Sequence, residues 1–227
     1  ILTFGSRREA DVHAEAIEER PGKGAHFYLC IGTHAEEIQL HVPGRHNVNN
    51  ALAAAAASLA AYVPVDAIRE GLCSYRGTER RFQVTEHDGV LLVDDAYNAS
   101  PLSFRAALET LQEFAGRRIF VVAGDMLELG ERSELFHDEL GRWLAETAPH
   151  ALLTVGRLAG RAGCSAVQAG LSPTAWMPCN TPEEAAARLR PQLQSGDVVL
   201  VKGSHGMKLE RCVKRLAERN PLALAGA

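Results

Sequence analysis

The sequence predicts an α/β protein that begins with a β-rich and then helical region and ends with a Rossmann-like, mainly parallel sheet. Three observations lead to this fold class. Residues 1–43 alternate apolar and polar positions in short runs, and residues 45–75 have an Ala-rich helical pattern. From residue 91 onward, short apolar strands alternate with helical segments, which is typical of a parallel sheet with crossover helices.

The first region contains two clear strand patterns, residues 27–31 and 38–42, separated by Gly32-Thr33 as in an antiparallel hairpin. Residues 1–5 also have a strand pattern. Because the chain starts in a strand without an initiator Met, we expect it to be a fragment of a longer protein.

Two helices follow, over residues 49–62 and 65–74, with Pro64 near the start of the second. We expect them to pack on a sheet that lies mostly outside this chain. A polar connection over residues 75–80 marks a boundary, which divides the chain into domains 1–77 and 78–227.

The second domain starts with a hairpin over residues 82–94 that turns at His87-Asp88-Gly89. An alternating series follows. The expected elements are a strand 91–94, helix 101–114, strand 118–123, helix 133–146, strand 151–155, helix 158–169, a weak strand 175–177, helix 182–192, strand 198–201 and helix 207–219.

Composition narrows the class of protein. The chain has 227 residues, 46% of them hydrophobic, and a formal net charge of −4 with scattered Lys and Arg, which disfavours nucleic acid as a partner. No apolar run approaches the roughly 20 residues of a membrane span. The five cysteines are odd in number and lack a C-x-x-C pair, and with the nine histidines they form no metal-ligand pattern. We expect a cytoplasmic protein with reduced thiols.

Three apolar strands end in polar, turn-forming segments, at residues 93–101, 120–130 and 198–207. Carboxyl ends of parallel strands meet helix N-termini at one edge of a sheet, where unpaired N–H groups favour anions. We therefore expect these three loops to line one ligand site. The turn at residues 124–126 has a single glycine and no G-x-G-x-x-G pattern, which disfavours a dinucleotide-dependent dehydrogenase.

Four segments together resemble the Mur ligase family. Residues 43–54 read Pro-Gly-Arg-His-Asn-Val-Asn-Asn-Ala-Leu-Ala-Ala, like the family's His-Asn-x-x-Asn-Ala-Leu-Ala helix start. Residues 94–101 read Asp-Asp-Ala-Tyr-Asn-Ala-Ser-Pro, with Ser where Asn is more usual. Residues 124–130 (Gly-Asp-Met-Leu-Glu-Leu-Gly) and 202–210 (Lys-Gly-Ser-His-Gly-Met-Lys-Leu-Glu) are most like the type that uses D-alanyl-D-alanine. The resemblance covers nearly the whole chain.

This resemblance implies an ATP-dependent amide ligase of peptidoglycan-precursor synthesis. Such an enzyme joins D-alanyl-D-alanine to a UDP-N-acetylmuramoyl tripeptide through an acyl phosphate. Residues 1–77 would be the end of the central ATPase domain and residues 78–227 the entire C-terminal domain. The chain has no G-x-x-x-x-G-K-[ST] phosphate loop, so the Mg²⁺ ligands are expected elsewhere and this chain alone is expected to be inactive. We expect a bacterial, cytoplasmic monomer.

The resemblance also implies nucleotide-binding residues, each with a simpler alternative. Asn47 and Asn50 would bind the adenine edge, or else cap the helix. Arg81 would reach the nucleotide, although Arg80 makes the register ambiguous and an exposed Arg is usually only solvated. Asp95 and Asn98 would meet the ribose and phosphates, and the same segment would start a helix at Ser100-Pro101. Asp94 and Asp95 should point to opposite faces of their strand.

Candidate residues for the incoming dipeptide lie in the other two loops. Lys202 and Asp125 are the candidate catalytic residues, and Gly203 and Ser204 the candidate substrate-binding residues. The alternatives are a surface lysine in an ordinary strand-to-helix turn and an aspartate that merely caps its turn. His137 is expected to be structural or at the surface rather than a base.

Two other functions remain open from the sequence. One is a related amide ligase with a different amine, such as a folylpolyglutamate synthase or another Mur-type enzyme. The other is a non-catalytic binding module built on the Rossmann-like domain alone. The Gly-Asp-Met-x-Glu-Leu-Gly segment disfavours the first of these without excluding a changed specificity.

Overall fold

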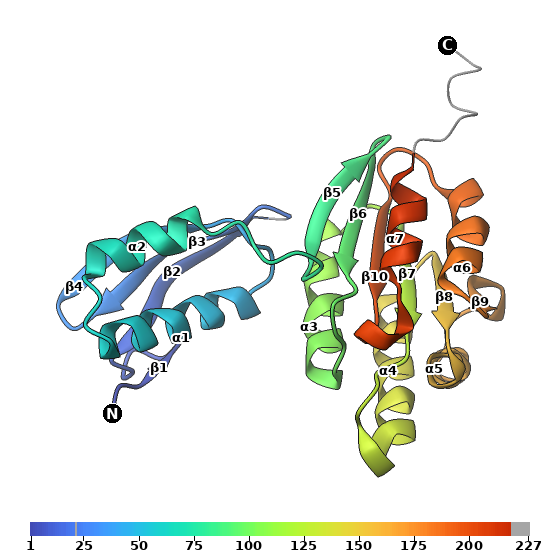
Figure 1. Cartoon of the computed structure of the whole chain (residues 1–227), viewed down its shortest axis with the longest axis horizontal. Coiled ribbons are helices and arrows are strands. Elements are labelled where there is room, and N and C mark those ends of the chain that lie inside the picture. The colour runs from blue at the N-terminus through green and yellow to red at the C-terminus, as the bar shows by residue number, and fades with distance from the viewer. Residues whose placement is uncertain (21, 219–227) are drawn as a thin grey trace. The chain divides into compact units, whose positions relative to one another are not determined.

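A computed structural model of the chain describes residues 1–20 and 22–218. The chain divides into two compact units, Ile1–Gly77 and Thr78–Ala227. Each is described by itself (Figure 1).

The first unit contains a four-stranded sheet in the order β1-β2-β3-β4. Its strands are β1 (Phe4–Gly5), β2 (Val12–Arg20), β3 (Gly24–Ile31) and β4 (His34–Leu40). β1 is parallel to β2, and the other neighbours are antiparallel, so the predicted hairpin turning at Gly32-Thr33 is confirmed.

Two helices, α1 (His46–Ala60) and α2 (Val65–Ser74), cover one face of this sheet. The expectation that they pack on a sheet outside the chain is therefore wrong. The inward positions of β2–β4 are apolar and need a cover, which α1 provides with its Ala-rich face. The shared core includes Val12, Phe27, Leu29, Ile38, Leu52, Ala55 and Ile68. At about 25 cal/mol per Å² of apolar surface, this burial is the main force holding the unit together.

The second unit contains a six-stranded sheet in the order β5-β6-β10-β7-β8-β9. All neighbouring strands are parallel except β5 and β6, which form the antiparallel hairpin at one edge. The predicted mainly parallel α/β fold is confirmed. Its strands are β5 (Gln83–His87), β6 (Val90–Asp95), β7 (Ile119–Gly124), β8 (Ala151–Val155), β9 (Trp176–Cys179) and β10 (Val198–Lys202).

Helices cover both faces of the second sheet (Figure 1). α3 (Pro101–Leu111), α4 (Ser133–Thr147) and α5 (Arg157–Gln168) contribute to one core, and α6 (Pro182–Leu189) and α7 (Glu210–Ala217) to the other. Every residue of β10 is buried, as expected for a central parallel strand covered on both sides.

The last helix starts three residues later than the sequence pattern suggested. A 3₁₀ turn occupies His205–Met207, and Lys208 adopts a left-handed conformation with φ +54° before α7 begins at Glu210. The predicted end of this helix, Arg219, lies outside the described residues. No helix in the described part of the chain is long and apolar enough to span a membrane.

Candidate functional site

The three strands that carry the predicted loops are neighbours in the sheet, in the order β6-β10-β7. Their register pairs Lys202, the last residue of β10, with Asp95 on β6 and Ala123 on β7. Lys202 Nζ lies 2.6 Å from Asp95 Oδ2. The three loops therefore start from one edge of the sheet, as the sequence predicts.

Lys202 is only 1% exposed, so the alternative of a surface lysine is wrong. Its ammonium also donates to the carbonyl of Asn98 at 3.3 Å and lies 5.4 Å from the centre of the Phe104 ring. Burial lowers the pKa of Lys202, and the neighbouring charge of Arg81 acts in the same direction, while Asp95 opposes both. The other Asp95 oxygen, Oδ1, accepts a hydrogen bond from the Phe82 N–H at 3.1 Å.

Asp94 does not share this ion pair. Its Oδ1 accepts a hydrogen bond from the Ala96 N–H at 3.1 Å, and burial raises the pKa of the Asp94 carboxyl. Consecutive strand residues point to opposite faces, which separates the roles of Asp94 and Asp95. They do not act as a pair of carboxylates.

Asp125, after β7, caps a helix other than its own. α5 begins after Gly156, which has no side chain to offer as a cap, and Asp125 Oδ1 accepts from the Ala159 N–H at 2.6 Å. A Cβ at Gly156, where φ is +109°, would lie 2.4 Å from that same oxygen. The glycine and the aspartate are therefore required together.

Ser204 joins the three loops. Its hydroxyl accepts from the Leu127 N–H at 2.9 Å and faces the Ala99 carbonyl at 3.5 Å, and its N–H donates to the Asp125 carbonyl at 3.1 Å. Next to it, a Cβ on Gly203 would lie 3.0 Å from Gly124 Cα and 2.7 Å from the Leu209 side chain. Close packing of the two turns is thus sufficient reason for glycine at position 203.

His137 supports the loop after β7 from α4. It is fully buried, its Nε2 accepts from the Met126 N–H at 3.0 Å, and its Nδ1 lies 2.6 Å from the Ser133 carbonyl. A carbonyl only accepts, so Nδ1 carries the proton and the ring is neutral. Of the two expected alternatives, the surface position is wrong, and these contacts fit the structural one.

The two consecutive arginines differ in their surroundings. Arg80 donates to the Ala96 carbonyl and to Glu210, both at 2.8 Å, so its guanidinium is part of the framework. Arg81 is exposed and stacks over the Tyr97 ring at 4.6 Å. Of the two, Arg81 is the one placed to meet a ligand.

The start of α3 satisfies the helix-cap alternative and leaves Asn98 accessible. Ser100 is the N-cap and forms a capping box with Ser103, and Pro101 is the first helical residue. Asn98 is exposed, with its Oδ1 accepting from the next N–H, that of Ala99, at 2.8 Å.

Asn47 and Asn50 belong to the first unit and share one face of α1. No side chain caps α1. Instead, Asn47 Nδ2 donates to the Pro43 carbonyl at 2.6 Å, and Asn50 Nδ2 donates to Asn47 Oδ1 at 3.0 Å. Both amides line a pocket of about 440 Å³ whose other walls include Leu40, Leu72 and Tyr75. A pocket of this size suits a small-molecule ligand.

Three contributors to these sites were not anticipated from the sequence: Phe104 beneath Lys202, Tyr97 beneath Arg81 and Glu210 beside Arg80. Tyr97 stands in the quoted 94–101 segment, so a search for aromatic neighbours of the candidate arginine could have found it. Glu210 is 130 positions from Arg80, and no local pattern connects them.

Comparison with known families identifies both units. The protein family described as "Mur ligase middle domain" matches residues 1–58, and the family described as "Mur ligase, glutamate ligase domain" matches residues 80–205. The chain belongs to the Mur ligase family.

Among curated relatives, the chain is similar to UDP-N-acetylmuramoyl-tripeptide–D-alanyl-D-alanine ligases. It is 34% identical to that of Escherichia coli over 86% of this chain and 42% of the relative, and 30% identical to that of Bacillus subtilis over 97% and 48%. It is also 33% identical to a UDP-N-acetylmuramate–L-alanine ligase of Salinibacter ruber, over 90% and 44%. The chain thus spans about half the length of the relatives it matches.

Solved structures of the D-alanyl-D-alanine type, called MurF, are similar over 96% of the chain. A crystal structure of MurF from Acinetobacter baumannii has a TM-score of 0.84 at 34% identity and is covered over 47% of its length. MurF from Thermotoga maritima in complex with ADP has a TM-score of 0.78 at 28% identity and is covered over 48%.

Proposed function

We propose that this chain is the C-terminal half of an ATP-dependent ligase that joins D-alanyl-D-alanine to a UDP-N-acetylmuramoyl tripeptide. The γ-phosphoryl group of ATP passes to a carboxylate oxygen of the tripeptide, giving an acyl phosphate and ADP. The dipeptide amine then attacks the acyl carbon, loses a proton, and displaces inorganic phosphate as the amide forms. Such a reaction depends mainly on positioning and charge neutralisation.

One observation carries this proposal. The relatives that resemble the chain over both of its units, in sequence and in structure, include MurF proteins from distant bacteria, and one of these was solved with ADP. The same relatives are consistent with peptidoglycan synthesis as the process and the bacterial cytoplasm as the location. We propose a monomer.

Asn47 and Asn50 are proposed to bind the adenine base. Their mutual hydrogen bond orients both amides, and Asn50 is exposed at the pocket. A carboxamide offers a donor and an acceptor side by side, which matches the N6 and N7 edge of adenine. The apolar walls of the pocket suit the faces of the ring.

Arg81 and Asn98 are proposed to meet the phosphates and ribose in the second unit. Both are exposed, and stacking on Tyr97 limits the conformations open to the Arg81 guanidinium. Asp95 is proposed to act with them by positioning, since its two oxygens are already engaged with Lys202 and the Phe82 N–H.

Lys202, Asp125, Gly203 and Ser204 are proposed to shape the dipeptide site. Lys202 and Asp125 are 1% and 9% exposed and hydrogen-bonded within the protein, which favours positioning of loop backbone over direct contact with substrate. The Ser204 cross-links bring the three loops to a common geometry, and their backbone groups would receive the dipeptide.

The described residues contain no group of three neighbouring carboxylates that could bind magnesium without help from a substrate. Mg²⁺ prefers several oxygen ligands, and the one group of three neighbouring His, Cys, Asp or Glu side chains found in residues 1–20 and 22–218 contains a sulfur and a nitrogen. We therefore propose that Mg²⁺ and the ATP phosphates are held by the part of the ligase outside this chain, and that the chain alone does not hydrolyse ATP.

A second candidate is another Mur-type ligase with a different amine, because the relative from Salinibacter ruber acts, by its name, on UDP-N-acetylmuramate and L-alanine. Both candidates share the acyl-phosphate chemistry, and only the substrates distinguish them.

The test is phosphate release by the intact protein from ATP. We expect release with UDP-N-acetylmuramoyl tripeptide plus D-alanyl-D-alanine, and none with UDP-N-acetylmuramate plus L-alanine, with glutamate as the amine, or without an amine. Release only with L-alanine would select the second candidate. No release with any pair would instead favour a non-catalytic binding module. The 227-residue chain serves as the matched inactive control.

A further inference from the structure

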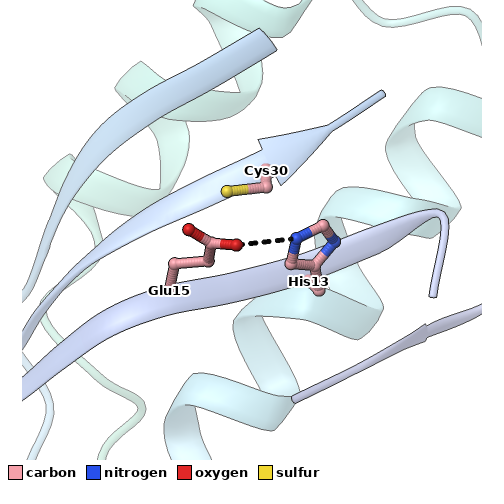
Figure 2. A group of neighbouring side chains, drawn as sticks. All are labelled: His13, Glu15 and Cys30. Carbon is pink, nitrogen blue, oxygen red and sulfur yellow. Dashed lines mark ion pairs between the residues drawn. The ribbon is translucent and has the colours of Figure 1, made fainter. Parts of the chain in front are cut away.

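Three chemically different side chains face one another on the sheet of the first unit. His13 and Glu15 lie on β2, and Cys30 lies on β3, directly opposite His13 in the strand register. Strand residues two apart share a face, so the register brings all three to one side of the sheet. Figure 2 shows the thiol, the carboxylate and the imidazole pointing toward a common space, and their ligand atoms all lie within 4.8 Å of one another.

The imidazole of His13 is oriented as it would be in a metal ligand. Its Nδ1 lies 3.0 Å from the Ala10 carbonyl, which only accepts, so Nδ1 carries a proton. In the neutral ring the lone pair is then on Nε2. A backbone carbonyl that fixes the tautomer in this way is the usual support of a metal-binding histidine.

The lone pair of Nε2 points toward a carboxylate. Nε2 lies 3.6 Å from Glu15 Oε1 (Figure 2). Both atoms are acceptors, and although Glu15 Oε1 also has the Arg8 guanidinium 2.9 Å away, the space between Nε2 and Oε1 suits a proton or a metal ion. Two ligands about 2.0–2.1 Å from one tetrahedral zinc ion are about 3.4 Å apart, close to the observed separation.

The thiol distinguishes the two cases. A proton shared by His13 and Glu15 gives sulfur no role, whereas a borderline-soft divalent ion prefers thiolate and imidazole ligands. Cys30 is 9% exposed, and its weak contact with the Tyr28 carbonyl, at 3.8 Å, leaves it available. Burial, and then the charge of Glu15, raise the pKa of the thiol, so binding has to displace its proton.

We propose that His13, Glu15 and Cys30 form a zinc-binding site on the outer face of the first unit's sheet. The site offers one nitrogen, one oxygen and one sulfur ligand and leaves a fourth position for water. Its net ligand charge of −2 matches the ion. The inference does not depend on the ligase activity.

One nearby cation has to move when zinc binds. Arg8 Nε lies 2.9 Å from Glu15 Oε1, and the Arg8 side chain is 80% exposed. Exposed ion pairs contribute little to stability, so Arg8 is easily displaced.

The test uses the whole 227-residue chain after removal of metals. Cobalt(II) is added first as a spectroscopic probe and is then displaced by zinc. We expect one ion per chain, a sulfur-to-cobalt charge-transfer absorption in the near ultraviolet, and intense visible bands of a four-coordinate ion. Cys30→Ser should abolish the charge-transfer band and weaken zinc binding about 100-fold or more, since even outer contacts of metal ligands are worth 10–100-fold.

Two further variants keep the test decisive. Glu15 is partly exposed, so its position should tolerate substitution. Glu15→Gln leaves the Cys30 thiol in place, and it should weaken zinc binding while keeping the charge-transfer band. Cys73→Ser removes another thiol of the same unit and should change neither. Absence of the band in the unmodified chain, or its survival in Cys30→Ser, would overturn the proposal.

Discussion

Two cation-containing pairs lie in the three-loop region of the second unit and differ in almost every physical respect. The inner pair, Lys202 and Asp95, is buried, and its two side chains are 2.6 Å apart with further partners on both. The outer pair, Arg81 and Tyr97, is exposed, and the Arg81 guanidinium stacks over the Tyr97 ring. Each pair contains a cation, Lys202 or Arg81, that the Mur ligase resemblance implies to be functional.

This difference in burial indicates that the inner pair stabilises the fold around the site, whereas the outer pair is accessible to a ligand. A buried charge is tolerable only while its partner is present, whereas an exposed cation stays solvated with or without one. The inner pair is therefore expected to determine the stability of the second unit, and the outer pair to determine its affinity for the nucleotide.

The largest effect is expected from Lys202→Met, which removes the ammonium that lies 2.6 Å from the buried Asp95 carboxylate. Removal of one member of a buried ion pair costs about 3–5 kcal/mol. Both tryptophans, Trp143 and Trp176, lie in the second unit, so their fluorescence during urea unfolding reports on this unit.

The control for this prediction is the double variant Lys202→Met with Asp95→Asn. An asparagine is neutral and still offers Oδ1 to the Phe82 N–H, so the double variant should recover most of the lost stability. If the double variant instead loses as much stability as the two single variants together, Lys202 and Asp95 do not interact energetically, and the contrast with the outer pair disappears.

Much of this arrangement could be predicted from sequence because strand patterns are local. The apolar runs ending in polar turns located β6, β7 and β10, and the rule that carboxyl ends of parallel strands meet then brought Asp95, Asp125 and Lys202 to one edge. The burial of Lys202 could not be predicted in this way. It depends on Phe104 of α3 and on the register with Asp95, both of which are set by packing between distant segments.

The same limit applies to the first unit. The sequence contains no closely spaced set of His and Cys residues typical of a metal site, yet His13 and Cys30 are neighbours through strand register. Likewise, the sequence pattern did not predict β2 as a separate strand. Because β2 pairs with β3 and enlarges the hairpin into a sheet, the packing of the helices on that sheet could not be predicted either.

Asp125→Ala is expected to have an intermediate effect, because Asp125 is buried like the inner pair but holds a helix end instead of a charge. Loss of a helix cap costs about 0.5–2 kcal/mol, here at the Ala159 N–H of α5. The loss is measured as the change in the free energy of unfolding by urea. Asp125→Asn keeps the accepting oxygen and should be nearly neutral. Equal losses in both variants would mean that the charge matters, as it would for a residue that binds an ammonium.

Asp94→Asn tests a carboxylate that lacks the buried cation of its neighbour. Because burial raises the pKa of Asp94 in the folded protein, the charged form disfavours folding, and the penalty is absent below the unfolded value near 3.8. The variant should therefore gain stability over the unmodified chain as the pH rises from about 4 to 7, by less than Asp125→Ala loses. A stability difference that does not change with pH would contradict the assigned burial effect.

Arg81→Ala should have the smallest effect on folding and a clear effect on the ligase. The side chain is exposed and its loss should change the free energy of unfolding by no more than about 0.5 kcal/mol. In the intact protein, a lost charge-assisted hydrogen bond to a phosphate is worth about 1.5 kcal/mol or more, which is roughly a tenfold rise in the KM for ATP. Arg81→Lys keeps the charge without the planar stacking surface, so its KM for ATP should lie between those of the unmodified protein and Arg81→Ala. If Arg81→Ala unfolds the second unit while ATP affinity in folded protein is unchanged, the outer pair is structural, and the distinction between the two pairs fails.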